Sequence, residues 1–402
     1  MNDSQVIIIG AGPVGLMLAN FLGDQGIPVL VLDRRVTPPP TSQAIGVTPP
    51  SLHLFAKLGL DEALIGQGIQ IQDCHVHGQS GYLGCASFRK IDPPHPFILS
   101  LPQRLHMQAL EERLARLPCV ALRRGVEVLD VRDSTDQQAA ICLTDKGEFR
   151  GSYIIGCDGH RSLVRERIGT KIRRVDYGCH FMMGDFEDHS GLGPEAHLWF
   201  TATGAVESFP LPQGLRRWIV QTAQPETAGD FGGISRLVLQ RTGHDLPVEQ
   251  QQNQTSFSPW RLDCRQYHRG RLILCGDAAH VMSPIGGQGM NTGWADAEFL
   301  AEALAGILQG RYQAAPVLAA YEKHRREAAG VAAGRAARGM WLGTWTGLPA
   351  SRLRDFIMRH CLFKGPLAAE LGPFFSMQTI PFNRLERVPA KVWQECSAKR
   401  KA

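Results

Sequence analysis

Residues 6–15 read Val-Ile-Ile-Ile-Gly-Ala-Gly-Pro-Val-Gly, and this stretch decides the fold class. Its four β-branched residues in a row are typical of a buried parallel strand. After the glycine-rich turn, residues 13–25 carry apolar side chains at helical spacing, and residues 29–32 predict a second strand. The sequence therefore predicts a β-α-β unit that opens a doubly wound α/β sheet.

Each glycine of the turn has a predicted task at a dinucleotide site. Gly10 permits the tight turn off the strand, Gly12 lets the backbone approach a pyrophosphate, and Gly15 lets helix and strand pack closely. The helix N-terminus directs free N–H groups at the phosphates. Asp33 ends the second strand about 20 residues on, where an acid binds a ribose hydroxyl. The pattern favours a bound dinucleotide over an unrelated glycine-rich turn, and it does not separate FAD from NAD.

Composition narrows the class of protein further. The chain has 402 residues, 44% of them hydrophobic, and a formal net charge of +5, which fits anionic small molecules without requiring a nucleic acid. The 10 cysteines are scattered, with no CxxC pair and no His/Cys cluster at zinc spacing, so we expect free thiols and no metal. Without a basic N-terminal region or about 18 consecutive apolar residues, we expect a cytoplasmic protein with no transmembrane segment.

The patterns along the chain predict four segments. Residues 1–175 form the first part of a nucleotide-binding domain, with a helix at 103–117, a β-meander from 126 to 143 and a strand at 153–155. Residues 176–264 carry short β-prone pieces between glycines and prolines, typical of an antiparallel sheet. Residues 265–340 return to the first domain with a strand at 271–275 and a helical run at 288–330, and residues 341–402 predict a C-terminal helical segment. We expect the 176–264 sheet and strands within 70–100 to form the substrate pocket.

A second motif runs from Gly276 to Asn291. A predicted strand ends in Gly276-Asp277, a glycine-rich loop follows, and a helix then begins. The Asp277 carboxylate can bond a sugar or ribityl hydroxyl, and the helix start directs N–H groups at an anion such as a reduced flavin. On composition alone, a capped helix after a flexible loop explains the pattern equally well.

A third motif is Cys157-Asp158-Gly159-His160-Arg161-Ser162. Asp158 follows a predicted strand, so we expect its side chain at the carboxyl edge of the sheet, where ligands bind in such folds. The plain alternative is a β-turn between a strand and a helix, for which Asp-Gly is a natural pair.

The three motifs, in this order, resemble those of the group A flavoprotein monooxygenases, which include the para-hydroxybenzoate and phenol hydroxylases. The resemblance implies a Rossmann-like, glutathione-reductase-type FAD-binding domain with a mixed or antiparallel substrate sheet. It implies that Asp277 binds the ribityl chain, that the loop from Pro284 to Asn291 lines the isoalloxazine ring, and that Asp158 serves both FAD and the visiting pyridine nucleotide. Gln103 resembles the family residue that touches the flavin side, and Arg104 could reach a phosphate. The predicted cofactor-binding residues are Gly10, Gly12, Pro13, Val14, Gly15, Asp33, Arg34, Arg35, Gln103, Arg104, Asp158, Gly159, Gly276, Asp277, Pro284, Gly286, Gly287, Gln288, Gly289, Met290 and Asn291.

The resemblance also implies an activity. A member of this family would be an FAD-dependent monooxygenase that consumes NADPH or NADH and O2 and hydroxylates an aromatic or other electron-rich small molecule through a C4a-hydroperoxyflavin. Two other classes stay open: a flavin-dependent reductase or dehydrogenase on the same scaffold, and a non-catalytic FAD-binding scaffold. The chain has no Trp-x-Trp-x-Ile-Pro run, which argues against a flavin halogenase. A homodimer also stays open.

The chain departs from the family at residues 42–46, where Gln43 stands in place of the usual Arg that neutralises the FAD pyrophosphate. Arg34, Arg35 or Arg104 could supply that charge instead. Arg34 and Arg35 also lie where an adenosine 2′-phosphate would be bound, which favours NADPH over NADH. A phenol substrate calls for a base or proton relay near the ring. The candidates by region, each of them more often a core or surface residue, are Tyr177, His180, His197 and Tyr267.

Overall fold

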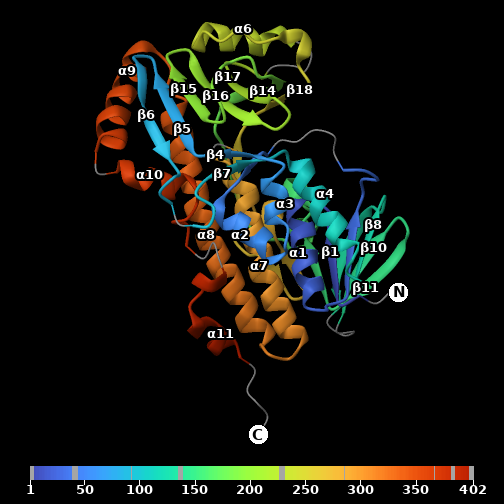
Figure 1. Ribbon diagram of the computed structural model, residues 1–402. Coiled ribbons are helices and arrows are strands. Elements are labelled where there is room, and N and C mark those ends of the chain that lie inside the picture. Colours follow the sequence, from blue (N-terminus) through green and yellow to red (C-terminus); the bar gives the residue numbers. More distant parts are fainter. Residues whose placement is uncertain are drawn as a thin grey trace.

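The computed structural model describes residues 4–38, 44–91, 93–134, 139–225, 231–284, 286–365, 367–381 and 385–397. A six-stranded sheet with the strand order β20-β21-β12-β1-β2-β8 forms its nucleotide-binding half (Figure 1). Its strands are β1 (Val6–Ile9), β2 (Val29–Asp33), β8 (Val120–Arg124), β12 (Tyr153–Gly156), β20 (His268–Arg269) and β21 (Leu272–Leu274). All neighbours are parallel except β20, which runs antiparallel to β21.

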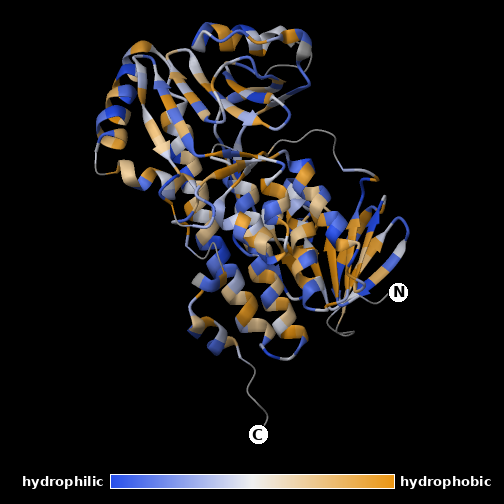
Figure 2. Ribbon diagram, viewed as in Figure 1, coloured by the Kyte–Doolittle hydropathy of each residue, from blue (hydrophilic) through white to orange (hydrophobic). Residues whose placement is uncertain are grey.

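Both faces of this sheet are covered, as the continuous apolar runs of its strands require. No side chain of β1 is more than 7% exposed, and Figure 2 shows the central strands as hydrophobic. Helices lie on one side of the sheet and a small antiparallel sheet lies on the other (Figure 1). The covering elements are α1 (Pro13–Asp24), α7 (Gln288–Leu308) and α8 (Ala314–Gly343), with β9 (Val128–Ser134), β10 (Ala139–Thr144) and β11 (Gly147–Gly151) opposite. The other helices of this half are α2 (Pro49–Lys57), α3 (Asp61–Ile65), α4 (Gln103–Leu114) and α5 (Leu163–Ile168).

A second sheet has seven strands in the order β18-β14-β17-β16-β15-β5-β6. Its strands are β5 (Asp73–Gly78), β6 (Gly81–Ser87), β14 (His180–Glu187), β15 (Ala196–Thr201), β16 (Gly204–Leu211), β17 (Leu215–Thr222) and β18 (Asn253–Phe257). Helix α6 (Phe231–Thr242) covers one face, the outer face, and buries Trp199, Val206 and Trp218 there. Met340 of α8 and Phe375 of the C-terminal helix α10 (Ala368–Phe375) pack against the opposite, inner face.

The two halves are joined by short strands and by the C-terminal helices. One three-stranded sheet consists of β3 (Gly46–Val47), β7 (Ile98–Ser100) and β4 (Ile69–Ile71), and another of β13 (Ile172–Asp176), β19 (Trp260–Cys264) and β22 (His280–Val281). The C-terminal elements are α9 (Leu348–Ile357), the π-helical turn η5 (Met358–Phe363), α10 (Ala368–Phe375) and α11 (Ala390–Cys396). Within the described ranges, no helix combines the length and the apolar character needed to cross a membrane.

The α/β fold class, with its parallel sheet, antiparallel second sheet and C-terminal helices, is confirmed. Two features differ from the predictions made from the sequence. The helical run predicted at 288–330 is two helices, and the second, α8, crosses the predicted segment border at residue 340. Helix α6 was not predicted, because it lies between β-prone pieces and supplies only one buried face to the sheet. Gln43 lies outside the described residues, so the replacement of the family's pyrophosphate-binding Arg by other arginines stays a prediction.

A stack of imidazole rings on the outer face predicts that acid destabilises the fold. His75 and His77 stack on His197 with ring centroids 4.9 and 5.5 Å away. Desolvation, followed by the two neighbouring rings, lowers the pKa of buried His197 from 6.5 to about 4. Because the unfolded chain binds this proton more readily, the contribution is fully present above pH 6.5 and is lost as the pH falls toward 4.

We expect wild type to lose about 2 kcal/mol of unfolding free energy through this group between about pH 7.5 and about pH 5. Urea titrations of wild type and of His197→Gln at both pH values measure it. The unfolding free energy of the variant should change less between the two pH values than that of wild type. An equal change in the two proteins would contradict the assignment.

Candidate cofactor and substrate site

Four of the predicted site residues follow neighbouring parallel strands. Strands β21, β12, β1 and β2 are adjacent in the sheet in that order. The chain leaves their carboxyl ends toward Asp277, Asp158 and Gly10, and Asp33 is the last residue of β2. The topology therefore gathers all three motifs at one edge of the sheet, where ligands bind in doubly wound folds.

The glycine turn is as tight as its sequence requires. Gly10 has a φ of +106°, and a Cβ there would lie 2.4 Å from the Cys157 carbonyl oxygen. A Cβ on Gly15 would lie 2.0 Å from the carbonyl oxygen of Gly10, so only glycine allows α1 to pack this closely on the turn. A Cβ on Gly12, in contrast, would meet no atom of the described residues beyond its chain neighbours within 4 Å. The backbone at Gly12, just before the N-terminus of α1, is thus open to an approaching anion.

Asp33 holds the glycine turn to the end of β2. Its Oδ2 accepts the N–H of Ala11 at 2.8 Å and its Oδ1 accepts the N–H of Arg35 at 2.8 Å. Each carboxylate oxygen has a further lone pair, so these bonds leave room for the predicted ribose hydroxyl. Arg34 and Arg35 are both exposed beside it, which suits the predicted phosphate contact.

Asp158 lies at the start of α5 with one oxygen used and one unused. Its Oδ2 accepts the N–H groups of Leu163 at 2.7 Å and Val164 at 3.3 Å. Its Oδ1 is buried, and no described residue bonds it. Burial raises the pKa of this carboxyl. Buried polar atoms are rarely left without a partner, so the free oxygen points to a ligand group.

The turn at Gly276-Asp277 is locked to the start of α1. Cβ atoms built on Gly276 and Gly293 would lie 3.1 and 2.6 Å from the side chain of Val14, which fits between these two glycines. The Trp294 indole N–H also donates to the Pro13 carbonyl at 3.1 Å. Asp277 itself is open to solvent, although the surrounding protein desolvates its carboxyl and raises its pKa. The carboxyl thus lies in a recess that a ligand can reach.

A buried ionic network behind this turn was not predicted from the sequence. Asp296 on α7 accepts from Arg325 on α8 at 2.6 Å, bonds the His280 ring nitrogen at 2.6 Å and accepts the Gly276 N–H at 3.2 Å. Burial by itself would raise the pKa of Asp296, but His280 and Arg325 hold it below the usual value. The network therefore fixes α7, α8 and the turn as one unit.

The loop before α7 is open on one side and anchored on the other. Pro284, Gly286 and Gly287 are exposed, and buried Gln288 has an Oε1 that no described residue bonds. Asn291 anchors the loop to β3, because its Oδ1 accepts the Thr48 N–H at 3.0 Å and its Nδ2 donates to the Gly46 carbonyl at 3.0 Å. Gly289 and Met290 are half-buried.

A cavity of about 590 Å³ lies between the inner face of the seven-stranded sheet and the start of α4. Arg104 lines it from α4, next to Gln103, the first residue of that helix. On the sheet side, Arg217 forms a bidentate pair with Asp185 at 2.6 and 2.8 Å, and both residues are buried. The size is in the range of small-molecule sites.

Glu207 stands one row away from this cavity on the same inner face. Its chain neighbours Val206 and Ser208 face α6, so strand alternation turns Glu207 to the other face of the sheet. On the neighbouring strands it pairs with Leu198 and Ile219. Phe209, two residues on, pairs with the cavity-lining Arg217. Glu207 is 9% exposed, no described residue bonds its carboxyl, and desolvation raises its pKa to about 7. The sequence did not single out this residue.

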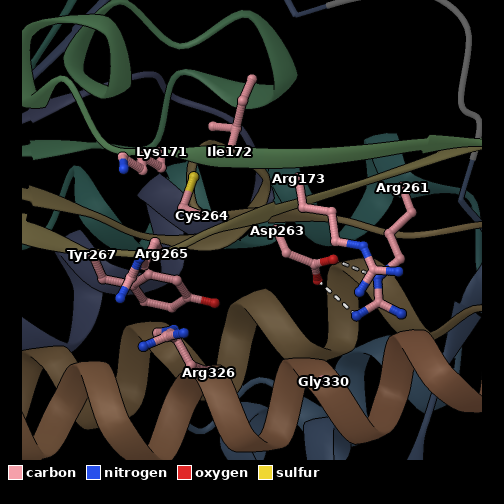
Figure 3. A pocket seen from close by; sticks show the side chains of 10 residues that line it. All are labelled: Lys171, Ile172, Arg173, Arg261, Asp263, Cys264, Arg265, Tyr267, Arg326 and Gly330. Atoms are coloured by element: carbon pink, nitrogen blue, oxygen red, sulfur yellow. Dashed lines mark hydrogen bonds and ion pairs between the residues drawn. The ribbon is translucent and has the colours of Figure 1, made fainter.

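A second hollow, of about 400 Å³, is strongly basic (Figure 3). Its cations are Lys171, Arg173, Arg261, Arg265 and Arg326. Among the described residues that line the hollow, Arg261 forms a bidentate pair with Asp263 at 2.7 and 2.9 Å. Arg261 alternates along β19 with Trp260, whose ring contacts His160 of the third motif. This hollow therefore lies on the face of β19 opposite to the one that contacts the third motif.

The four candidate bases are scattered. His197 stands on the outer face, Tyr267 is buried against His280 and Tyr321, and His180 bonds Ser258 at 2.7 Å. Tyr177 packs with Met340 at the inner face, and its buried hydroxyl has no partner among the described residues. Of the four candidates, Tyr177 alone lies at the inner face, where the unpredicted Glu207 also stands.

The parallel sheet, the glycine turn and the convergent acids define a dinucleotide-binding α/β protein. The free backbone at Gly12 and the unused oxygens of Asp158 and Gln288 fit a ligand with phosphate and sugar groups. A family model described as FAD binding domain matches residues 3–336. The chain belongs to this family, and its cofactor is FAD.

Two curated relatives and one solved structure show the range of this family. The chain is 34% identical to 6-methylpretetramide 4-monooxygenase of Streptomyces rimosus over 76% of its own length and 56% of that protein's. It is 32% identical to dialkyldecalin synthase of Streptomyces rugosporus, over 83% and 71% of the two lengths. The structure of p-nitrophenol 4-monooxygenase PnpA from Pseudomonas putida DLL-E4 superposes with a TM-score of 0.83 at 25% identity, covering 94% of this chain and 99% of that one.

Proposed function

We propose that the protein is an FAD-dependent monooxygenase that uses NADPH or NADH and O2 to hydroxylate an aromatic or other electron-rich small molecule. The balanced reaction consumes one NAD(P)H, one proton and one O2, and it yields the hydroxylated product, NAD(P)⁺ and water. The observation that carries the proposal is the meeting of the three motifs at one sheet edge. The inner face of the second sheet also lines a cavity of about 590 Å³. Relatives named as monooxygenases support it.

In this proposal each motif holds one part of FAD. The open backbone at Gly12 and the α1 N-terminus receive the pyrophosphate, and Asp33 receives the adenosine ribose. Asp158 and Asp277 bond the ribityl side, and the loop ending in Asn291 lines the ring. Bound FAD supplies the redox chemistry, since it accepts a hydride and activates O2. The protein positions the substrate and excludes water.

Product mass tests the activity. FAD-loaded protein, NADPH or NADH, and a panel of phenols that carry hydrogen at the ring positions ortho and para to the hydroxyl should yield a product heavier by one oxygen atom, labelled when oxygen-18 gas is used. A product heavier by two hydrogens would overturn the monooxygenase in favour of the reductase. The likeness to dialkyldecalin synthase raises a cyclase as a further alternative. Failure of NAD(P)H to reduce the bound flavin would favour that class.

We also propose that Glu207 bonds the substrate. A buried carboxyl without a protein partner lowers stability, so its presence calls for a compensating ligand group. Glu207 lies on the inner face with its pKa at about 7, next to the row of side chains that lines the cavity. A carboxyl that titrates near neutral pH can accept a proton from a phenolic hydroxyl.

Glu207→Gln is therefore expected to gain stability and lose activity. The folded pKa is raised from 4.5 to about 7, so wild type loses stability as the pH rises through this window. At about pH 8 the variant should be more stable by about 3 kcal/mol, and near pH 5 by less than about 1 kcal/mol. Turnover should fall about a hundredfold.

Urea unfolding and steady-state turnover at both pH values measure these effects. The control is Glu148→Gln on β11, a partly exposed side chain that pairs with Arg150 and should leave both quantities nearly unchanged. A pH-independent stability difference, together with normal turnover, would exclude the proposed role of Glu207.

A further inference from the structure

Helix α9 buries three polar side chains and exposes three large apolar ones. The inward residues are Ser351, Arg354 and Asp355, all buried. Arg354 donates to the Trp345 carbonyl at 2.8 Å, and Asp355 accepts the backbone N–H and the hydroxyl of Ser80 at 2.8 and 2.9 Å. These bonds fix the orientation of the helix against β5 and its neighbours (Figure 1).

The outward stripe of α9 follows helical spacing. Leu348, Arg352 and Phe356 lie at i, i+4 and i+8, with Leu353 beside them. Phe356 is 61% exposed and Leu353 is 54% exposed. Figure 2 shows hydrophilic and hydrophobic residues in alternation along α9. A soluble surface helix normally turns its apolar stripe to the core, so this reversed arrangement indicates an apolar phase outside.

The charged residues around the stripe are almost all basic. Residues 338–367 contain five Arg and Lys residues and a single acid, Asp355, which is buried against Ser80. Arg338, Arg352 and Lys364 are exposed. Trp341, also exposed, packs edge-on against Trp345, whose carbonyl bonds Arg354 of α9. Exposed Trp, Phe and Leu flanked by cations are the composition of helices that lie in a membrane interface.

We infer that the outward face of α9 binds the surface of an anionic phospholipid membrane. A second copy of the chain fits this face poorly, because a two-fold contact sets each patch against itself and here opposes cation to cation. Anionic lipid headgroups instead pair with Arg352 and Lys364, while Leu353 and Phe356 enter the interface. This inference does not depend on the proposed reaction.

Cosedimentation with vesicles tests the inference on the FAD-loaded protein without turnover. We expect binding to phosphatidylcholine vesicles that contain phosphatidylserine, weaker binding to phosphatidylcholine alone, and release as salt increases. The double variant Leu353→Glu, Phe356→Glu should bind at least about tenfold more weakly. Arg352→Gln with Lys364→Gln should also bind on the order of tenfold more weakly.

Leu129→Glu on β9 is the matched control, because Leu129 is 55% exposed, far from α9 in the sequence. It should bind vesicles like wild type, and all variants should retain FAD. Absence of wild-type binding to anionic vesicles overturns the inference, and so does equal binding by the Leu353→Glu, Phe356→Glu variant. A dimer in sedimentation equilibrium that this variant disperses, without vesicle binding, would identify the face as a subunit interface instead.

Discussion

Gly12→Ala is expected to bind FAD at least about tenfold more weakly while the FAD-free protein keeps its stability within about 0.5 kcal/mol. The Cβ of the variant enters space in which no atom of the described residues beyond its chain neighbours lies within 4 Å, so we expect the apoprotein to accommodate it. That same space is where we place the pyrophosphate. FAD titration and urea unfolding of the apoprotein measure the two quantities separately.

Gly15→Ala is the matched comparison. It should also bind FAD more weakly, but because the protein itself is disrupted and not because the space for the ligand is filled. Its Cβ would lie 2.0 Å from the Gly10 carbonyl oxygen and 3.2 Å from the Cys157 Cβ. Helix α1 must then move off the turn, so the apoprotein itself should lose about 3 kcal/mol or more. Normal FAD affinity in Gly12→Ala would show that the pyrophosphate lies elsewhere.

Asp296→Asn is expected to lower the unfolding free energy by about 3 to 5 kcal/mol. Asp296 and Arg325 are both fully buried, and the substitution leaves the guanidinium without its charged partner. The turn at Gly276 should loosen as well, because Asp296 accepts its N–H. Urea unfolding gives the stability, and the dissociation constant of FAD reports on the turn.

Glu302→Gln serves as the control, since its pair with Arg311 at 2.8 Å is partly exposed and should matter by less than about 1 kcal/mol. Adding Arg325→Met to Asp296→Asn should restore part of the loss, because the unpaired cation is then gone. Strictly additive losses in the double variant would show that the two side chains contribute independently.

The nucleotide-binding half could be predicted because its determinants are local. The run at residues 6–9, the spacing of Gly10, Gly12 and Gly15, and the placement of Asp33 each depend on a few consecutive residues. Those patterns predict the strand, the turn and the helix that the structure contains.

The features that escaped prediction depend on pairing between distant elements. Glu207 stands out only when cross-strand register shows that its side chain faces away from α6. The Asp296–Arg325 pair needs the packing of α7 on α8, although both residues lie in stretches that resemble the family. The basic hollow collects cations from β13, β19 and α8, which are separate in the sequence.

Val14, held between Gly276 and Gly293, has a consequence for the order of events in biosynthesis. The glycine turn at the start of the chain reaches its final packing only after more than half of the polypeptide has been made. Such long-range contacts form slowly, because the intervening chain must first be ordered. A nascent chain that ends before Gly293 lacks these contacts of Val14, so we expect FAD to bind only after this later part of the chain has been made.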